Sequence, residues 1–170
     1  GASAGTISNV IHDTLLRYDA ASDSYKPGLA ESWSMSADNK ELTVKLKKGI
    51  KFHDGTAFTA KDAAVHMNRI LDPKNKSRSR SFITAIKGAE VIDDHTIKYV
   101  LKHPWLPLMG SLAAINMIGL IPSSANVEAD KQARHPIGTR PYRFKSWAGG
   151  DRIVVEKNPD YHEPGTAKFD

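Results

Sequence analysis

The chain has 170 residues, a formal net charge of +5 and no cysteine. Its 40% apolar and 25% charged residues are the balance of a folded domain and argue against disorder. A cysteine nucleophile is excluded, no apolar stretch approaches the roughly 18 residues of a membrane span, and a charge of +5 spread over a domain is weak support for a nucleic-acid or membrane partner.

Helix and turn signals fill the first quarter of the chain. Apolar residues at helical spacing predict a helix from about residue 6 to residue 17. Residues 29–33 are expected to form a short helical turn. Asp38-Asn39 then favours a turn into a strand over residues 41–46, where apolar and polar side chains alternate.

A turn and a helix follow in unbroken succession. Asp54-Gly55 is a turn dipeptide, because glycine accepts a positive φ and aspartate bonds its own backbone. Thr59 stands three residues before Asp62, which is typical of a capping box at a helix start. The spacing of the apolar residues predicts a helix over 60–71, and Pro73 ends it because its ring lacks an N–H donor.

The next segment predicts one hairpin and one buried strand. Residues 74–80 are polar and basic without an apolar anchor, so we expect a mobile loop there. Alternating runs on either side of residues 93–95 predict a hairpin. A short helix is expected between Pro104 and the residues after Pro107, and the apolar run 115–121 is interpreted as a buried strand.

The last segment predicts a capped helix, a loop and a further hairpin. Ser123 or Ser124 is expected to cap a polar helix that runs to about residue 133. Residues 135–142 hold two prolines and a glycine and are expected to be irregular, and a hairpin is predicted around residues 149–150. Hairpins with interspersed helices favour a fold between α/β and α+β, with a mixed sheet, antiparallel hairpins and flanking helices.

Motifs for catalysis or metal binding are absent from the sequence. The seven histidines show no tight metal-ligand spacing and are interpreted as scattered surface residues. No G-x-S-x-G elbow or glycine-rich phosphate loop occurs, and the adjacent acids Asp93 and Asp94 fall in an expected turn. The sequence therefore predicts no enzyme, no metal and no cofactor.

Two residues are candidate ligand contacts on local grounds. Trp105 lies between two prolines, an unusual setting, although packing in the core is the default role of a tryptophan. Asn116 is the polar interruption at the start of an apolar run, where an amide can orient a ligand or bond within the core.

Three motifs together carry a family resemblance: GLAESW, KGIKFHDGTAFTAKD and HPIGTRPYRFKSW, in that order. The sequence resembles the family 5 extracellular solute-binding proteins, the peptide- and nickel-type receptors of bacterial ABC importers. The resemblance implies that residues 1–157 are part of lobe I of a type II periplasmic-binding-protein fold. It also implies that residues 158–170 are a linker toward the remainder of a longer chain.

The resemblance implies a substrate-binding component that captures peptides or a similar small solute by clamshell closure and delivers it to a membrane permease. It implies a monomer, no nucleic-acid partner and a periplasmic or other extracytoplasmic location, although no signal peptide is present in the sequence. Oligopeptide, dipeptide, nickel chelate, glutathione and sugar all remain open as ligands.

The resemblance also points to site residues. Asn116 and Met117 correspond to a stretch that tends to line the cleft in relatives. Arg140 replaces the middle glycine of the family's G-T-G-P-Y loop and places a cation near the expected hinge side of the cleft. If that position has a positive φ, arginine costs about 1 kcal/mol there. The KFHDG and HPIGT-PYRF motifs are expected to be structural.

A second class of function stays open beside the receptor. A basic interaction module would bind an anionic polymer or a membrane surface, and a steep salt dependence of that binding would identify it.

Overall fold

The computed structural model describes residues 4–114, 118–129, 131–148, 152–163 and 165–166. In chain order the elements are α1 (Ala4–Ile11), β1 (Leu16–Asp19), β2 (Ser24–Pro27), β3 (Ala30–Met35), β4 (Glu41–Leu46), α2 (Ala60–Leu71), the 3-10 turns η1 (Pro73–Asn75) and η2 (Arg78–Phe82), β5 (Ile86–Asp93), β6 (Thr96–Leu101), α3 (Leu108–Ala113), α4 (Ser124–Glu128), β7 (Tyr142–Ala148) and β8 (Arg152–Lys157).

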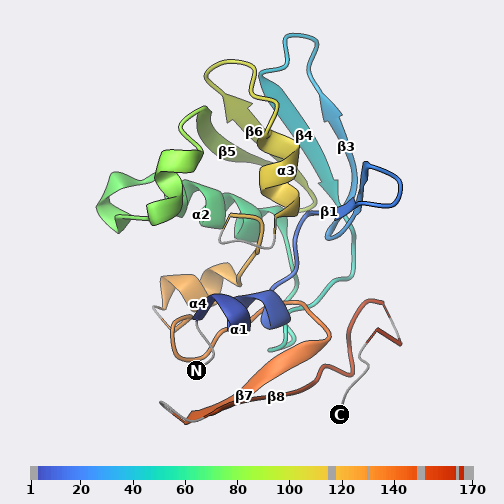
Figure 1. Cartoon of the computed structure of the whole chain (residues 1–170), viewed down its shortest axis with the longest axis vertical. Coiled ribbons are helices and arrows are strands. Elements are labelled where there is room, and N and C mark those ends of the chain that lie inside the picture. Colours follow the sequence, from blue (N-terminus) through green and yellow to red (C-terminus); the bar gives the residue numbers. More distant parts are fainter. Residues whose placement is uncertain (1–3, 115–117, 130, 149–151, 164, 167–170) are drawn as a thin grey trace.

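The described elements form an upper and a lower part. Figure 1 shows the four-stranded sheet and α3 in the upper part, and α1, α4 and the β7–β8 hairpin in the lower part, with α2 below the sheet. The strand order of the sheet is β3-β4-β6-β5, and the pairs β1–β2 and β7–β8 stand apart from it. Each of these pairings is antiparallel, where the sequence suggested a mixed sheet.

The main core lies between the sheet and α2. Leu42, Val44 and Leu46 alternate with less buried residues along β4 and are almost fully buried, as the period of two predicts. Ile97 and Tyr99 of the neighbouring β6 are buried in the same way. The hairpin expected around residues 93–95 is confirmed as β5–β6, and Asp38-Asn39 does turn β3 into β4.

The helix expected over 60–71 is confirmed with the same bounds, and its capping box is present. The backbone N–H of Thr59 donates to Oδ2 of Asp62 (2.9 Å). Asp62 is buried, and its Oδ1 accepts the backbone N–H of Ser124 (2.8 Å) at the start of α4. One carboxylate therefore serves the N-terminal ends of two helices, where backbone N–H groups lack helical partners.

The helix predicted from residue 6 to residue 17 is wrong in its second half. α1 ends at Ile11 and β1 begins at Leu16. The carbonyl groups of Thr14 and Leu15 accept backbone N–H groups from residues 28–30 rather than from the next helical turn. Residues 11–16 are all buried, and six consecutive residues would face all sides of a helix rather than one apolar stripe.

The helical turn expected over residues 29–33 is also wrong, because Ala30–Met35 is strand β3, paired with β4. The pattern of a five-residue segment does not separate a turn of helix from a strand, and here the pairing with β4 decides.

Three further expectations are corrected after α2. Residues 74–80, expected to be a mobile loop without an apolar anchor, form parts of two 3-10 turns, and Ser79 is buried. Within the expected strand 115–121, the described residues 118–121 make one isolated bridge, from Leu120 to Thr14, and no strand. α4 ends at Glu128 instead of near residue 133. The short helix expected at Pro104 and Pro107 is confirmed as α3, which begins after Pro107.

The loop over residues 135–141 is bonded to α1 and to the segment of the Asp54-Gly55 turn. Arg140 donates its backbone N–H to the carbonyl of Ile11 (3.1 Å). Nε2–H of His53 donates to the Arg140 carbonyl (2.9 Å), and Nδ1 of His53 accepts the N–H of Gly138 (3.4 Å). A Cβ at Gly138 would collide with the Ile11 carbonyl, so this close approach requires glycine. Both motifs that were expected to be structural meet here.

Candidate functional site

An open cavity of about 400 Å³ lies where α1, α2, α4 and β7 approach one another. His66, Arg69 and Ile70 of α2 line it at i, i+3 and i+4, the spacing that places side chains on one helix face. Ser8 of α1 and His12, the residue after α1, line it as well. The volume falls within the roughly 300–1000 Å³ of small-ligand pockets.

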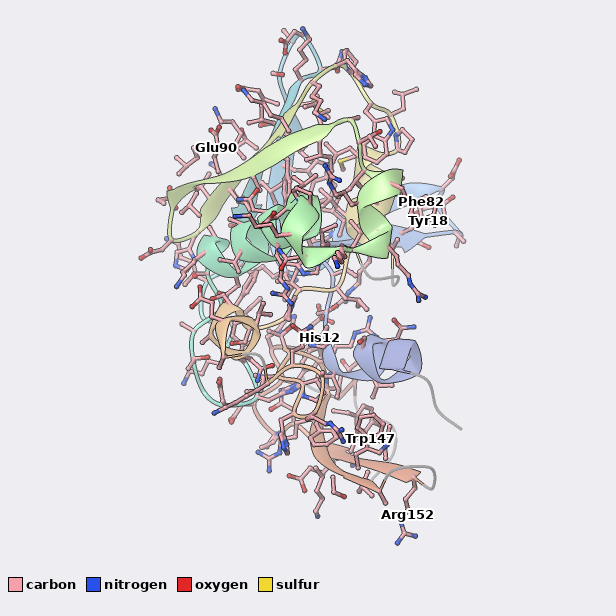
Figure 2. All side chains as sticks on the ribbon, turned by 90° about the vertical axis from the view of Figure 1, so that its left-hand side faces the viewer. His12, Tyr18, Phe82, Glu90, Trp147 and Arg152 are labelled. Carbon is pink, nitrogen blue, oxygen red and sulfur yellow. The ribbon has the colours of Figure 1, made fainter. Side chains whose placement is uncertain are left out.

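Part of the wall is apolar and aromatic. Phe144 and Trp147 of β7 line the cavity, together with Val127 of α4. Trp147 is 42% exposed, and Figure 2 shows it on the lower hairpin, below His12. A partly exposed indole beside a cavity offers area against which the carbon skeleton of a solute can pack.

The charged groups at the cavity are cationic. Arg69 is exposed and lines the wall, and the guanidinium of Arg134 lies 5.7 Å from the centre of the Trp147 ring. No acidic side chain is among the described residues that line the cavity. The remaining polar groups are hydroxyls and amides, such as Ser77 and Gln132, and the imidazoles of His12 and His66.

His12 is a buried, neutral member of the wall, with 2% of its surface exposed. Burial, helped by the nearby His66, His53 and Arg140, lowers the pKa of His12 to about 3. Its Nδ1–H donates to the Ser8 carbonyl (3.3 Å), which leaves Nε2 as an acceptor without a partner in the described part of the chain. His12 is thus not the surface histidine that the sequence suggested.

A polar cluster beside the cavity holds the junction between α1 and β1. Asp13 is 1% exposed, and its Oδ2 accepts from Nη2 of Arg17 (3.1 Å) and from the hydroxyl of Tyr161 (3.1 Å). Arg17 also pairs with Glu163 (2.8 Å), and Nε of Arg140 lies 3.8 Å from Oδ1 of Asp13. Residues near both ends of the described chain therefore meet at one carboxylate.

Metal and membrane sites do not emerge from the described residues. No group of three or more histidine, cysteine, aspartate or glutamate side chains among them is placed to hold a metal ion. Within the same ranges, none of the helices combines the length and apolar character that a membrane crossing requires.

The match to a family model decides the assignment. The model of the bacterial extracellular solute-binding proteins, family 5, middle region, matches residues 24–170. The chain belongs to this family. Family 5 proteins bind solutes and are not enzymes, so the resemblance inferred from the three motifs is confirmed, and so is the non-enzymatic reading.

Relatives of known name extend the comparison. The glutathione-binding protein GsiB of Pectobacterium atrosepticum is 36% identical over 142 residues, which are 84% of this chain and 28% of that protein. The structure of AgaA from A. tumefaciens R10 in complex with agropinic acid matches with a TM-score of 0.84 and 35% identity, over 97% of this chain and 33% of that one. NikZ from Campylobacter jejuni in complex with Ni(L-His) matches with a TM-score of 0.80 and 28% identity, over 91% and 31%.

These matches confirm the mixed α/β fold class as part of a periplasmic-binding-protein structure. The family 5 chain spans about 28% of the length of the curated relatives it matches and about a third of the solved structures.

Of the four residues predicted as ligand contacts, the structure describes Trp105 and Arg140, and neither lines the cavity. Asn116 and Met117 lie outside the described residues; the adjoining Ile118 accepts Nε2–H of the cavity-lining His66 through its carbonyl (3.1 Å). Trp105 is half-buried against the core of the upper part and does not line the cavity. Its role as a ligand contact stays a prediction, as does that of Asn116 and Met117.

Arg140 is engaged in structure rather than lining the cavity. One Nη donates to the carbonyl of Asn9, and Nε lies by Asp13. Arg140 is not among the residues with positive φ, so the backbone strain considered for this position does not arise. Its proposed contact with a ligand stays untested.

The cavity residues that sequence reasoning missed had one usable signal. His66, Arg69 and Ile70 share a helix face with spacing that the sequence displays, whereas Ser77, Phe144 and Trp147 come from separate segments with no common pattern.

Proposed function

We propose that this family 5 chain provides one wall of the solute site in the substrate-binding component of an ABC importer. The observation that carries the proposal is the open cavity of about 400 Å³, with aromatic, cationic and amide groups in its wall, in a chain of a solute-binding family. In a two-lobed receptor, contacts from both lobes shift an open–closed equilibrium without any covalent step.

The solute we propose is a small, amino-acid-derived molecule. The relatives named above bind glutathione, agropinic acid and a nickel–histidine complex, and the cavity volume suits molecules of this size. A peptide fits the same description.

The arrangement we propose places residues 1–157 in lobe I, with residues 158–170 leading away from it. The first of these later residues, Asn158 to Glu163, pack on the lower part: Asn158 donates its backbone N–H to the Pro141 carbonyl (2.7 Å), and Glu163 pairs with Arg17. We propose a monomeric, extracytoplasmic receptor that delivers its solute to a membrane permease.

Calorimetry tests this function on the full-length protein that carries this sequence. Native mass spectrometry first identifies any solute that co-purifies, and titration with that solute or with glutathione then measures Kd. We expect micromolar or tighter binding by the full-length protein and weak or no binding by the isolated 170-residue chain. Tight binding by the isolated chain, or no solute for the full-length protein, would refute the proposal.

A second candidate function rests on a different groove of about 480 Å³. Four cationic side chains line it without an acidic one among the described residues: Lys76, Arg80, Lys87 and Lys102. Nζ of Lys102 donates to the Thr84 carbonyl (2.8 Å) and Nε of Arg80 to the Leu71 carbonyl (2.9 Å), so both cations are held in place. This favours a surface that binds an anionic membrane.

Co-flotation with vesicles tests the second candidate. Retention on phosphatidylglycerol vesicles, but not on phosphatidylcholine vesicles, with a steep loss as salt rises, would support it. A Lys87→Gln/Lys102→Gln variant should then lose the retention. Equal behaviour on both vesicle types contradicts a membrane role.

A further inference from the structure

We infer that the solute bound in the cavity carries a carboxylate and that Arg69 binds this group. The inference rests on the proposed solute-binding function and adds to it the chemical class of the solute and the residue that selects it.

The charged side chains at the cavity wall are positive. Arg69 lines the cavity, Arg134 lies over the ring of the lining Trp147, and no described lining residue is acidic. A cation in a concave site with no neighbouring anion attracts negatively charged ligands and disfavours positively charged ones.

Arg69 differs from the arginines elsewhere in the described chain that already bind carboxylates. Arg143 pairs with Glu156 (2.8 Å), and Arg17 pairs with Glu163 (2.8 Å). No ion pair involves Arg69 within the described residues, and its side chain is exposed at the cavity. Its guanidinium is therefore available for a bidentate contact with a carboxylate.

The backbone at Arg69 is held in place. Arg69 lies in the last turn of α2, and Nδ2 of Asn75 donates to its carbonyl (3.1 Å). Asn75 and Ser77 line the cavity from η1 and the residue before η2, so amide and hydroxyl groups stand near the same helix end. These groups can bond the polar atoms beside a carboxylate.

His12 of the wall does not supply the positive charge. His12 is buried, and its pKa is lowered to about 3, so it is neutral at pH 7. Its Nε2 is an acceptor but is buried, so it is not a contact of the solute. The aromatic wall at Phe144 and Trp147 suits the carbon skeleton of the solute. Together Arg69 and this wall suit an organic solute with a free carboxylate.

The test compares two solutes and two variants of the full-length protein by calorimetry at pH 7. The solutes are glutathione and the same tripeptide with both carboxylates amidated. The variants are Arg69→Gln and, as a matched control, Arg78→Gln, which removes an exposed cation from η2 that does not line the cavity. Thermal unfolding of both variants checks that they remain folded.

We expect Arg69→Gln to raise the Kd for glutathione by about tenfold or more, since a hydrogen bond to a charged group is lost. Arg78→Gln should leave Kd unchanged within about twofold. The amidated tripeptide should bind the unmodified protein more weakly, and its Kd should not respond to Arg69→Gln. An unchanged Kd for glutathione in folded Arg69→Gln overturns the inference.

If glutathione does not bind, the charge of the co-purified solute tests the inference. An anionic solute whose retention falls in Arg69→Gln supports the inference, and a neutral or cationic solute overturns it while leaving the solute-binding function intact. If the full-length protein neither co-purifies with a solute nor binds one, the proposed function fails, and the inference fails with it.

Discussion

The upper and lower parts of this chain are held together by different forces. In the upper part, alternating side chains of β4 and β6 bury their apolar faces against α2, and the contacts join residues that are neighbours in adjacent strands. In the lower part, α1, the loop 135–141 and the tail meet through polar groups more than 100 residues apart in sequence. Periodic burial is visible in a sequence, and polar contacts over such separations are not.

The upper part contributes mainly to the stability of the fold, and the lower part contributes mainly to the proposed solute site. The core of the upper part is built mainly from apolar side chains. The lower part and the adjoining face of α2 supply the wall of the cavity. We therefore expect the two parts to respond differently to substitution.

The largest effect is expected in the upper core. Leu42→Ala removes a side chain that is fully buried in β4 and should lower the free energy of unfolding by about 3 kcal/mol, because transfer and cavity terms add. Urea denaturation measures it. Met35→Ala on β3, where the side chain is 38% exposed, is the control and should cost under about 1 kcal/mol. Similar losses for both would mean that the sheet does not bury its core as described.

A smaller loss is expected at the polar cluster. Asp13→Ala removes the carboxylate that Arg17 and Tyr161 share and should cost about 2 kcal/mol; the partial exposure of Arg17 keeps the loss below that of a fully buried ion pair. Limited proteolysis should then cut near residues 158–163 earlier. Glu31→Gln, an exposed side chain without an ion pair in the described residues, should change neither quantity.

Acid should destabilise the lower part through His12. Its folded pKa of about 3 lies below the ordinary value of 6.5, so the unfolded chain binds the extra proton between these values. The stabilising contribution is complete above pH 6.5 and declines as pH falls toward 3, by at most about 1.4 kcal/mol for each pH unit. Unfolding of His12→Gln should show a shallower pH dependence over this window. An unchanged slope would contradict the buried, neutral state.

The smallest effect on stability is expected at Tyr99, in the apolar core of the upper part. The hydroxyl of Tyr99 is fully buried in β6 and has no hydrogen-bond partner among the described residues. Tyr99→Phe should change the free energy of unfolding by less than about 0.5 kcal/mol or stabilise the fold slightly, since a buried hydroxyl without a partner carries a desolvation cost. A loss above about 1 kcal/mol would mean that the hydroxyl is bonded after all.

Local signals predicted much of this fold. The α2 helix follows from the Thr59–Asp62 capping box and the apolar spacing, and the hairpins follow from alternation around turn residues. The errors fall where distant segments decide. Residues 12–17 have helical spacing but leave the helix because residues 28–30 bond to Thr14 and Leu15. Strand β3 is set by its pairing with β4 and not by its own composition.

The candidate site was less accessible to prediction. Arg140 was singled out for its departure from a loop motif, and it bonds to Asn9 and Asp13 instead of lining the cavity. Arg69 lies in no motif, and its place at the cavity without an ion pair among the described residues is apparent only from the structure.

The carboxylate of Asp62 has a mechanical consequence for the cavity. Because Oδ2 of Asp62 accepts from Thr59 at the start of α2 and Oδ1 accepts from Ser124 at the start of α4, one carboxylate ties together two helices that line the cavity at Ile70 and Val127. Separating α2 from α4 would break the buried hydrogen bond to the Ser124 N–H, so we expect this edge of the cavity to resist movement. The segments of the wall that Asp62 does not bond directly are α1, residues 75–77, residues 132–136 and β7.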